Sequence, residues 1–243
     1  MTRLPVALCA ASAWCAAGFA PAAPRRSAAI RANGNANDET YANPLTELLG
    51  RVLPSAKAGD ADDAKWIVPK RPARSLDAMV NTLRKELSAR EWFVTGDVLP
   101  ELFADDFYFE DPDVKLSGIR NYAEGVARLF DADSCRVEII TCTADRDFGT
   151  VDVAWRLSGR VKVGFGLNLK PYVVATELRV KDGLVTFQRD RFANPSSDIL
   201  LSALAPWLPF LAPPAPPLGD AALEAQAAKL VAEVRADRRK APP

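Results

Sequence analysis

Apolar residues recur at helical spacing in three stretches of the sequence. The first stretch covers residues 76–90, and Ser75 directly before it can cap the first turn. A second, shorter stretch covers 98–103, and a third covers 119–130. We therefore expect three helices in the first half of the folded region.

The apolar pattern changes to alternation after these helices, which is typical of β-strands. A short strand is predicted directly before Pro112, which cannot continue a sheet ladder. A two-residue turn signal, Asp182-Gly183, predicts a hairpin between the last two strands. The alternation leaves polar residues on one side, so the sheet should keep one face in water. We predict strands over 107–111, 137–142, 151–157, 160–169, 171–181 and 184–192.

The hairpin turn also predicts which residues of the last two strands face each other. In a regular hairpin, Leu178 lies opposite Phe187, and the same apolar face continues with Thr176 opposite Arg189. Asp190 then lies on the other, polar face. Because a sheet of this kind buries one side, the face with Thr176 and Arg189 is expected to meet the helices.

The composition of the chain changes on both sides of this region. The stretch 199–211 is apolar, but it is too short and contains too many prolines for a transmembrane helix. We expect it to pack on the sheet or on a dimer surface, or else to contact a membrane surface or a partner. The last helix has a narrow apolar stripe and is expected to be solvated and partly docked. The chain is thus divided into a presequence at 1–32, a mostly disordered linker at 33–74 with a short helical candidate at 44–53, a folded domain at 75–195, an apolar and proline-rich segment at 196–218, and a C-terminal helix at 219–243.

The first 32 residues have the composition of a targeting sequence. They contain four arginines and no acidic residue, and an apolar block at 4–17 is followed by small residues. This order resembles the bipartite plastid presequence of algae with secondary plastids, in which a signal peptide precedes a motif centred on Phe; here the motif reads AAGFAP around Phe19. The resemblance implies the plastid stroma. The alternative is secretion, with a disordered segment after the signal peptide.

Composition excludes several classes of function. The chain has no His, so mechanisms that need an imidazole base or a histidine metal ligand are ruled out. It carries 31 Lys and Arg and 31 Asp and Glu, so there is no basic field for nucleic acid. Cys135 and Cys142 lie seven positions apart on a predicted strand and should face opposite sides without forming a disulfide. No metal, dinucleotide or phosphate motif is found, so no cofactor is expected.

The order of elements and two motifs resemble a known family. The residues that carry the likeness are LFADDFYFEDP at 102–112, GIRNY at 118–122 and the last hairpin. They resemble the SnoaL-like branch of the NTF2-like superfamily, and among its groups the plastid and cyanobacterial domain of unknown function DUF2358. The resemblance implies an α+β fold, the NTF2-like cone, in which a curved antiparallel sheet wraps around three N-terminal helices and a C-terminal helical extension follows. It also implies an apolar pocket at the open end of the cone and a homodimer formed through the sheet.

Asp111 is the candidate for chemistry in such a pocket. It shares a face with Phe107 and Phe109, and a carboxylate among aromatic rings has a raised pKa and can act as a general base. Alternatively, Asp111 caps the turn at Pro112 or pairs with an arginine. Arg189, on the inward face of the last hairpin, is the expected partner of a carboxylate or an anionic ligand group, or else forms an ion pair at the rim of the sheet.

The remaining candidate ligand-binding residues are aromatic or small and polar. Tyr122 and Trp155 lie at positions typical of a core, so they either line the pocket or serve only for packing. Thr176 lies on the inward face of the predicted hairpin. Together with Phe107, Phe109 and Arg189, these residues form the expected ligand-binding set.

Three hypotheses of function follow from this reading. The first is a binding protein that holds a small apolar molecule, such as an isoprenoid, a lipid or a pigment-like compound, in the cone. The second is an isomerase or cyclase without histidine that uses Asp111 as general base. The third is a scaffold or assembly factor for a photosynthetic complex, which acts through the outer face of the sheet and the segment 199–211.

Overall fold

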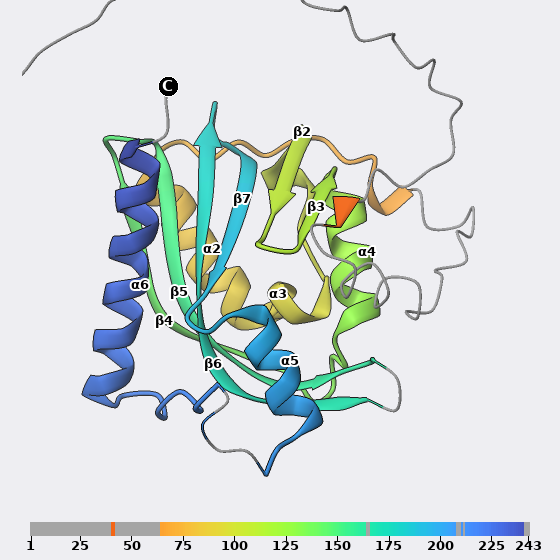
Figure 1. The fold of residues 1–243 in the computed structure, drawn as a ribbon. Coiled ribbons are helices and arrows are strands. Elements are labelled where there is room, and N and C mark those ends of the chain that lie inside the picture. The colour runs from red at the N-terminus through yellow and green to blue at the C-terminus, as the bar shows by residue number, and fades with distance from the viewer. Residues whose placement is uncertain (1–39, 42–63, 164–165, 208–209, 211, 241–243) are drawn as a thin grey trace, which may run out of the picture. The chain divides into compact units, whose positions relative to one another are not determined.

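The computed structural model describes residues 40–41, 64–163, 166–207, 210 and 212–240 (Figure 1). The presequence at 1–32 and the helical candidate at 44–53 lie outside the described residues. The helices and strands are β1 (Thr40–Tyr41), α2 (Leu76–Arg90), α3 (Trp92–Thr95), the short 3-10 helix η2 (Pro100–Leu102), β2 (Phe103–Glu110), β3 (Val114–Ser117), α4 (Ile119–Leu129), β4 (Arg136–Asp145), β5 (Thr150–Val161), β6 (Leu167–Lys181), β7 (Leu184–Phe192), α5 (Ser196–Leu204) and α6 (Ala221–Lys240).

The strands form one curved sheet in the order β1-β3-β2-β7-β6-β5-β4. Neighbouring strands are antiparallel except β2 and β7, which pair in parallel. In Figure 1 the helices α2 and α3 lie against one face of this sheet, and α6 runs along the other face beside β4 and β5. The predicted α+β class, with a curved sheet around N-terminal helices and a C-terminal helix, is confirmed.

Two of the three predicted helices are confirmed. Helix α2 has the expected bounds, and the hydroxyl of Ser75 caps it by accepting the N–H of Ala78 at 3.1 Å. Helix α4 also forms where the apolar spacing placed it. The helix expected at 98–103 is wrong. Gly96 ends α3 in the left-handed region, Leu99 before Pro100 is extended, and only the short turn η2 follows.

The strand pattern is confirmed in outline, with three differences. Strand β2 begins at Phe103, earlier than expected, and β3 was not predicted. The predicted strand at 160–169 instead contains the end of β5 at Val161 and the start of β6 at Leu167. The short strand β3 pairs directly back onto β2 through the turn that follows Asp111. The apolar pattern of the sequence did not indicate this pairing.

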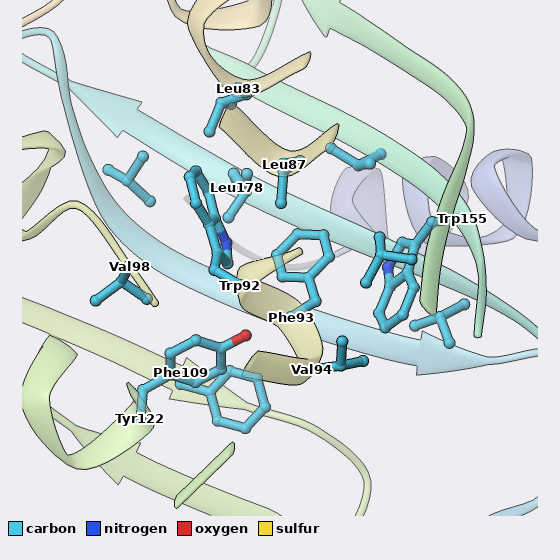
Figure 2. Close-up of a cluster of buried hydrophobic side chains, with 14 of the residues drawn as sticks. Leu83, Leu87, Trp92, Phe93, Val94, Val98, Phe109, Tyr122, Trp155 and Leu178 are labelled. Atoms are coloured by element: carbon cyan, nitrogen blue, oxygen red, sulfur yellow. The ribbon is translucent and has the colours of Figure 1, made fainter. Parts of the chain in front are cut away.

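The inner face of the sheet and the three N-terminal helices enclose the main core. The core contains a cluster of aromatic rings from α3, β2 and α4, which includes Trp92, Phe93, Phe109 and Tyr122 (Figure 2). Phe93 also reaches the sheet, where its ring lies 4.9 Å from that of Trp155. These contacts place an aromatic wall directly beside the inner face of β5, β6 and β7.

Helix α6 covers the outer face of the sheet, so the predicted exposed polar face is wrong for β5 and β6. Ala154, Val173 and Ala175 on these strands pack against Leu223 and Ala227 of α6. The helix is docked along its length, in contrast to the partly docked helix that its narrow stripe predicted. A stripe rich in alanine is sufficient because the strands opposite also present small side chains.

Charged residues hold the end of α6 on the sheet. Asp152 and Glu177 are almost fully buried under the helix, with exposed fractions of 2% and 0%. Arg238 is bonded to Asp152 and to Asp145, the latter at 2.9 Å, and its Nε lies 3.3 Å from Glu177 Oε2. Arg235 donates to Asp152 at 2.6 Å. Without these arginines the sheet would bury carboxylates without a counter-charge.

Helix α5 and the segment after it contact the core on one side only. Ile199 packs into the inner core cluster, as predicted for packing on the protein. Leu201, Leu204, Trp207 and Phe210 remain exposed, the last two by 74% and 73%. Within the described part of the chain, we find no helix with the length and apolar character needed to cross a bilayer.

The two cysteines of the described region are free and buried, which confirms the expectation of no disulfide. Both lie in the inner core cluster, so the prediction that they face opposite sides is wrong. The pairing of β4 with β5 shifts by one residue between Ile139 and Thr141. An irregularity of this kind interrupts the alternation, and two positions an odd number apart then point to the same side.

Candidate functional site

The hairpin of β6 and β7 determines which polar groups face the helices. Its turn forms as predicted, with Asp182 and Gly183 both at positive φ, and Val180 pairs with Val185. Beyond this pair the register shifts by one residue, because Thr186 forms a bulge. Thr176 consequently lies opposite Asp190, and the predicted pairing of Thr176 with Arg189 is wrong.

The bulge exchanges the two faces of β7. Arg189, expected inside, lies outside, where its Nε donates to Glu110 Oε1 at 2.5 Å and its guanidinium lies 5.3 Å from the ring of Phe187. The ion pair at the rim of the sheet, which was the alternative, is therefore what forms. Gln188 and Asp190 take the inward positions instead.

These inward groups form a continuous hydrogen-bonded network on the inner face of the sheet. The indole N–H of Trp155 donates to Thr176 Oγ1 at 3.0 Å, and the Thr176 hydroxyl donates to Asp190 Oδ1 at 2.7 Å. Gln188 Nε2 donates to Asp190 Oδ1 at 3.2 Å and to the Tyr122 hydroxyl oxygen at 3.1 Å. Strands β5, β6 and β7 and helix α4 are thus joined by one chain of polar side chains.

Aromatic rings border this network on the helix side. The ring of Tyr122 lies 4.9 Å from Phe109 and 6.1 Å from Phe107. Figure 2 shows Tyr122 and Phe109 next to each other beside the α3 residues. Of the predicted ligand-binding set, the structure brings together Phe107, Phe109, Tyr122, Trp155 and Thr176.

Asp111 caps the turn, which was the alternative that the sequence analysis gave for it. Its Oδ1 accepts the N–H of Asp113 at 2.7 Å and of Val114 at 2.6 Å, so it caps the turn between β2 and β3. Burial nevertheless raises its pKa to about 6, because desolvation outweighs these two hydrogen bonds. Asp111 is therefore a turn cap whose carboxyl group titrates close to neutral pH.

Asp190 is a second carboxyl group with a raised pKa. Burial raises it to about 7, although Thr176 and Gln188 both donate to the carboxylate, and the charge of Asp111 raises it further. Burial and the charges of Asp111 and Asp190 also raise the pKa values of Tyr122 and Tyr172. These four groups act on one another electrostatically and belong to one site.

The two carboxyl residues of the site are partly enclosed. Asp111 and Asp190 are both half-buried, and burial raises the pKa of each. In addition, Gln188 Oε1 and Trp92 Nε1 are buried without a hydrogen-bond partner among the described residues. Both residues are 0% exposed, so these two atoms are enclosed by packed side chains.

Sequence reasoning missed Tyr172, Gln188 and Asp190. The bulge at Thr186 moved the last two of these from the predicted outer face to the inner face. One signal was present: a regular hairpin would place both Arg189 and Arg191 on the buried side, opposite Thr176 and Val174. Two buried guanidinium groups without acidic partners are energetically unfavourable, which favours a register shift.

A metal site and a surface hollow are the other kinds of functional site to consider. Among the described residues, no three side chains of His, Cys, Asp or Glu are placed to hold a metal ion. A surface hollow of about 420 Å³ lies at the start of α2, lined by Ser75, Asp77 and Arg146 among others. Arg146 and Asp77 satisfy each other there at 2.9 Å, and both are exposed.

The architecture is that of an α+β domain whose curved sheet surrounds helices and carries a polar network with Asp190 on its inner face. Residues 87–188, which include most of this domain, match the sequence model of a SnoaL-like domain. This match supports the SnoaL-like and NTF2-like resemblance found in the sequence. It covers less than half of the 243 residues.

Comparison with solved structures gives similarities at low identity. A hypothetical protein with a ketosteroid isomerase-like fold from Catenulispora acidiphila, in complex with trimethylamine, has 18% identity and a TM-score of 0.40 over 50% of this chain and 91% of its own. An NTF2-like protein from Anabaena variabilis has 16% identity and a TM-score of 0.37 over 48% and 89%. An epoxide hydrolase from M. tuberculosis has 19% identity and a TM-score of 0.35 over 54% and 90%. No curated protein matches the chain.

Proposed function

We propose that the cone binds a small, largely apolar molecule that carries one polar group. The observation that carries this proposal is the polar network at Asp190, where a half-buried carboxylate on the inner face of the sheet accepts hydrogen bonds from Thr176 and Gln188. The aromatic rings of Phe109 and Tyr122 would contact the apolar part of the ligand. Ligand sites of this kind are mostly apolar, with a few polar groups that fix orientation.

Native mass spectrometry of the purified chain tests this proposal. The wild type is expected to carry an apolar molecule that solvent extraction releases. Phe109→Trp adds volume beside Tyr122 and should prevent co-purification. Phe103→Trp is the matched control, because Phe103 is equally part of the core but contacts Trp92 and Phe107 instead of Tyr122. A wild type that is reproducibly empty, from its natural source, would contradict the proposal.

A second candidate is an isomerase or cyclase that moves a proton within a bound ligand. The specific observation in its favour is the pair of carboxyl groups with pKa values of about 6 and about 7, because a base and an acid near neutral pH are what proton transfer needs. In D2O, such an enzyme would introduce deuterium at carbon in its ligand. The exchange should be lost in Asp111→Asn, which keeps an acceptor oxygen for the turn.

We also propose the plastid stroma as the location, on the strength of the presequence composition. The scaffold hypothesis names two contact surfaces, the outer face of the sheet and the segment 199–211. Helix α6 occupies the outer face of the sheet at β5 and β6, whereas Leu204, Trp207 and Phe210 remain exposed for a membrane surface or a partner. These exposed residues support a contact through 199–211 rather than through the sheet.

A further inference from the structure

The chain from 199 to 219 contains no charged residue, and it begins on α5 at one end of the domain. Figure 1 shows α5 and the chain after it at the end opposite to the turn between β6 and β7. The backbone N–H of Ala215 donates to Pro171 O at 2.6 Å, which holds the returning chain beside the first residues of β6. The large exposed side chains before the proline-rich part, which we call the apolar tip, are those of Leu201, Leu204, Trp207 and Phe210.

The side chains of this stretch offer little hydrogen bonding to a protein partner. Its polar side chains are those of Ser202 and Trp207. Ser202 is buried, and its hydroxyl donates to Ile199 O at 2.8 Å within α5. A protein interface forms about one hydrogen bond per 100–200 Å² and has a polar rim. A lipid surface takes up apolar side chains without such bonds, and Trp is enriched at its boundary. The composition of the stretch therefore favours a lipid surface.

The neighbouring ends of β5 and β6 add positive charge at the same end of the domain. Lys162 is exposed, and its Nζ donates to the neutral carbonyl of Ala127 at 3.0 Å, so this bond leaves its charge in place. Positive charges near an anionic membrane surface strengthen binding to it. Residues 157–176 contain no acidic residue and three basic ones, which are Arg160, Lys162 and Lys170.

Two acidic residues at this end limit that charge. Asp131 lies beside Arg160, whose carbonyl accepts the Asp131 N–H at 2.9 Å, so we give Arg160 no part in the attraction. Asp198 lies in the first turn of α5, where a negative charge stabilises the helix. Lys162 and Lys170 are therefore the groups that we expect to attract anionic lipid.

We propose that the apolar tip docks on a lipid membrane that carries anionic headgroups. Trp207 and Phe210, exposed by 74% and 73%, enter the boundary of the acyl chains, and Lys162 and Lys170 face the headgroups. Helix α5 ends at Leu204 and the proline at 206 prevents its continuation, so both aromatic side chains lie on a segment outside the helix. This inference goes beyond the ligand in the cone and names one occupant for the proposed contact through 199–211.

Co-sedimentation of the full chain with vesicles tests the proposal. Vesicles of equal parts phosphatidylcholine and phosphatidylglycerol are compared with vesicles of phosphatidylcholine alone, at low and high salt. We expect tighter binding to the anionic vesicles, and salt should weaken it. Trp207→Ser should weaken binding to both kinds of vesicle about tenfold, because burial of a large apolar side chain contributes about that factor. Lys162→Gln should weaken binding to the anionic vesicles alone, by about fivefold.

Matched controls lie on the same protein, away from the apolar tip. Ile67→Ser changes a side chain that is 83% exposed in the stretch before α2. Lys181→Gln removes an exposed positive charge from the other end of β6. Both variants should bind the two kinds of vesicle as the wild type does.

Quenching of tryptophan fluorescence by brominated lipid shows which part of the chain enters the bilayer. The apolar block at 4–17 contains Trp14 and is a second candidate for lipid binding, so this experiment uses a Trp14→Phe background. We expect quenching in this background and its loss on the further change Trp207→Phe, which keeps an aromatic ring. Trp92 and Trp155 are buried, with exposed fractions of 0% and 3%, so lipid does not reach them.

Three results would overturn the inference. The first is no binding to either kind of vesicle. The second is equal binding of the wild type and Trp207→Ser without quenching of Trp207, which would assign the binding to another part of the chain. The third is that Trp207→Ser leaves vesicle binding unchanged but abolishes self-association in sedimentation velocity, which would make a second copy the occupant of the contact. The ligand in the cone is measured separately, because Trp207→Ser should leave the molecule found by native mass spectrometry unchanged.

Discussion

The Asp190 carboxyl group should make the protein less stable as pH rises. Its pKa is about 7 in the folded state against an ordinary value of 3.8, because burial disfavours the charge. Between these values the unfolded chain loses the proton and the folded chain keeps it, so the free energy of unfolding decreases as pH rises and levels off above about pH 7. We expect Asp190→Asn, which cannot ionise, to gain roughly 2–4 kcal/mol over the wild type between pH 4.5 and pH 8.

Urea unfolding of both proteins at several pH values measures this difference. Subtracting the two stabilities removes the pH dependence of all other groups. Asp105→Asn serves as the reference, since its carboxylate is on the surface, where it pairs with Lys70. A wild-type-minus-variant difference that stays constant from pH 4.5 to pH 8 would rule out a desolvated Asp190.

Thr176 joins Trp155 to Asp190, and its hydroxyl should contribute measurably to stability. Thr176→Val keeps the shape of the side chain but leaves the indole N–H of Trp155 buried without an acceptor, so we expect a loss of about 1–3 kcal/mol. The pKa of Asp190 should rise further, because the Thr176 hydrogen bond lowers it. Thr141→Val, on the exposed side of β4, is the control and should stay within about 0.5 kcal/mol of the wild type in the same chemical unfolding experiment. Equal stabilities of the two variants would contradict the network.

At this scale the sequence predicted residue types better than their directions. Phe107, Phe109, Tyr122 and Trp155 were placed in the interior correctly, because their burial follows from the apolar alternation or helical spacing of the residues next to them. Asp190 was not, because direction on a strand depends on counting by two and a single bulged residue inverts every later position. Nothing local in the residues around Thr186 marks a bulge; only the cost of burying two arginines points to it.

Helix α6 should depend on Arg238 for its attachment to the sheet. Arg238→Met removes one of the two arginines that pair with each of the buried carboxylates Asp152 and Glu177. Arg235 still pairs with Asp152 and Arg179 with Glu177, so we expect a loss of about 1–3 kcal/mol. The adjacent Arg239→Met changes the same residue type at an exposed position and should cost under about 0.5 kcal/mol. Chemical unfolding gives the stabilities, and amide hydrogen exchange along α6 shows whether the helix detaches.

A compensating variant separates loss of charge balance from loss of packing. Replacing Arg238 with Met together with Asp152→Asn and Glu177→Gln removes the buried charges on both sides, and should recover most of the lost stability. If this variant is no more stable than Arg238→Met alone, the arginine acts mainly through the packing of its aliphatic part.

Elements with long, regular patterns were predicted well. Helix α2 has a cap and an uninterrupted apolar stripe, and the last hairpin has an Asp-Gly turn, so local forces alone specify them. Strand β3 and the docking of α6 depend on contacts with distant parts of the chain. The sequence of β3 has only four residues, which is too short for a clear pattern. The alanines of α6 do not by themselves predict docking, because docking depends on the small side chains of β5 and β6 that lie opposite.

At the scale of the whole molecule, the extensions after the domain change what the family resemblance implies. A homodimer through the outer face of the sheet would have to avoid β5 and β6, because α6 already occupies that surface. At the other end, Ile199 of α5 packs into the inner core while Trp207 and Phe210 stay exposed nearby in the sequence. These exposed apolar side chains thus follow directly after a helix that contacts the cone.

The presequence should deliver the full chain to the plastid of an alga with a secondary plastid, and Phe19 should decide the second step. We expect the apolar block at 4–17 to direct entry into the secretory route, and the following segment is basic and free of acid, as transit peptides are. With a fluorescent protein at the C-terminus of the full chain, we expect signal in the plastid for the wild type. Phe19→Ala should stop the protein before the stroma, whereas Phe130→Leu, a change outside the presequence, should leave its location unchanged. Accumulation of the wild type in the medium would establish the secretory alternative, and with it an oxidising environment in which Cys135 and Cys142 remain unpaired only because both are buried.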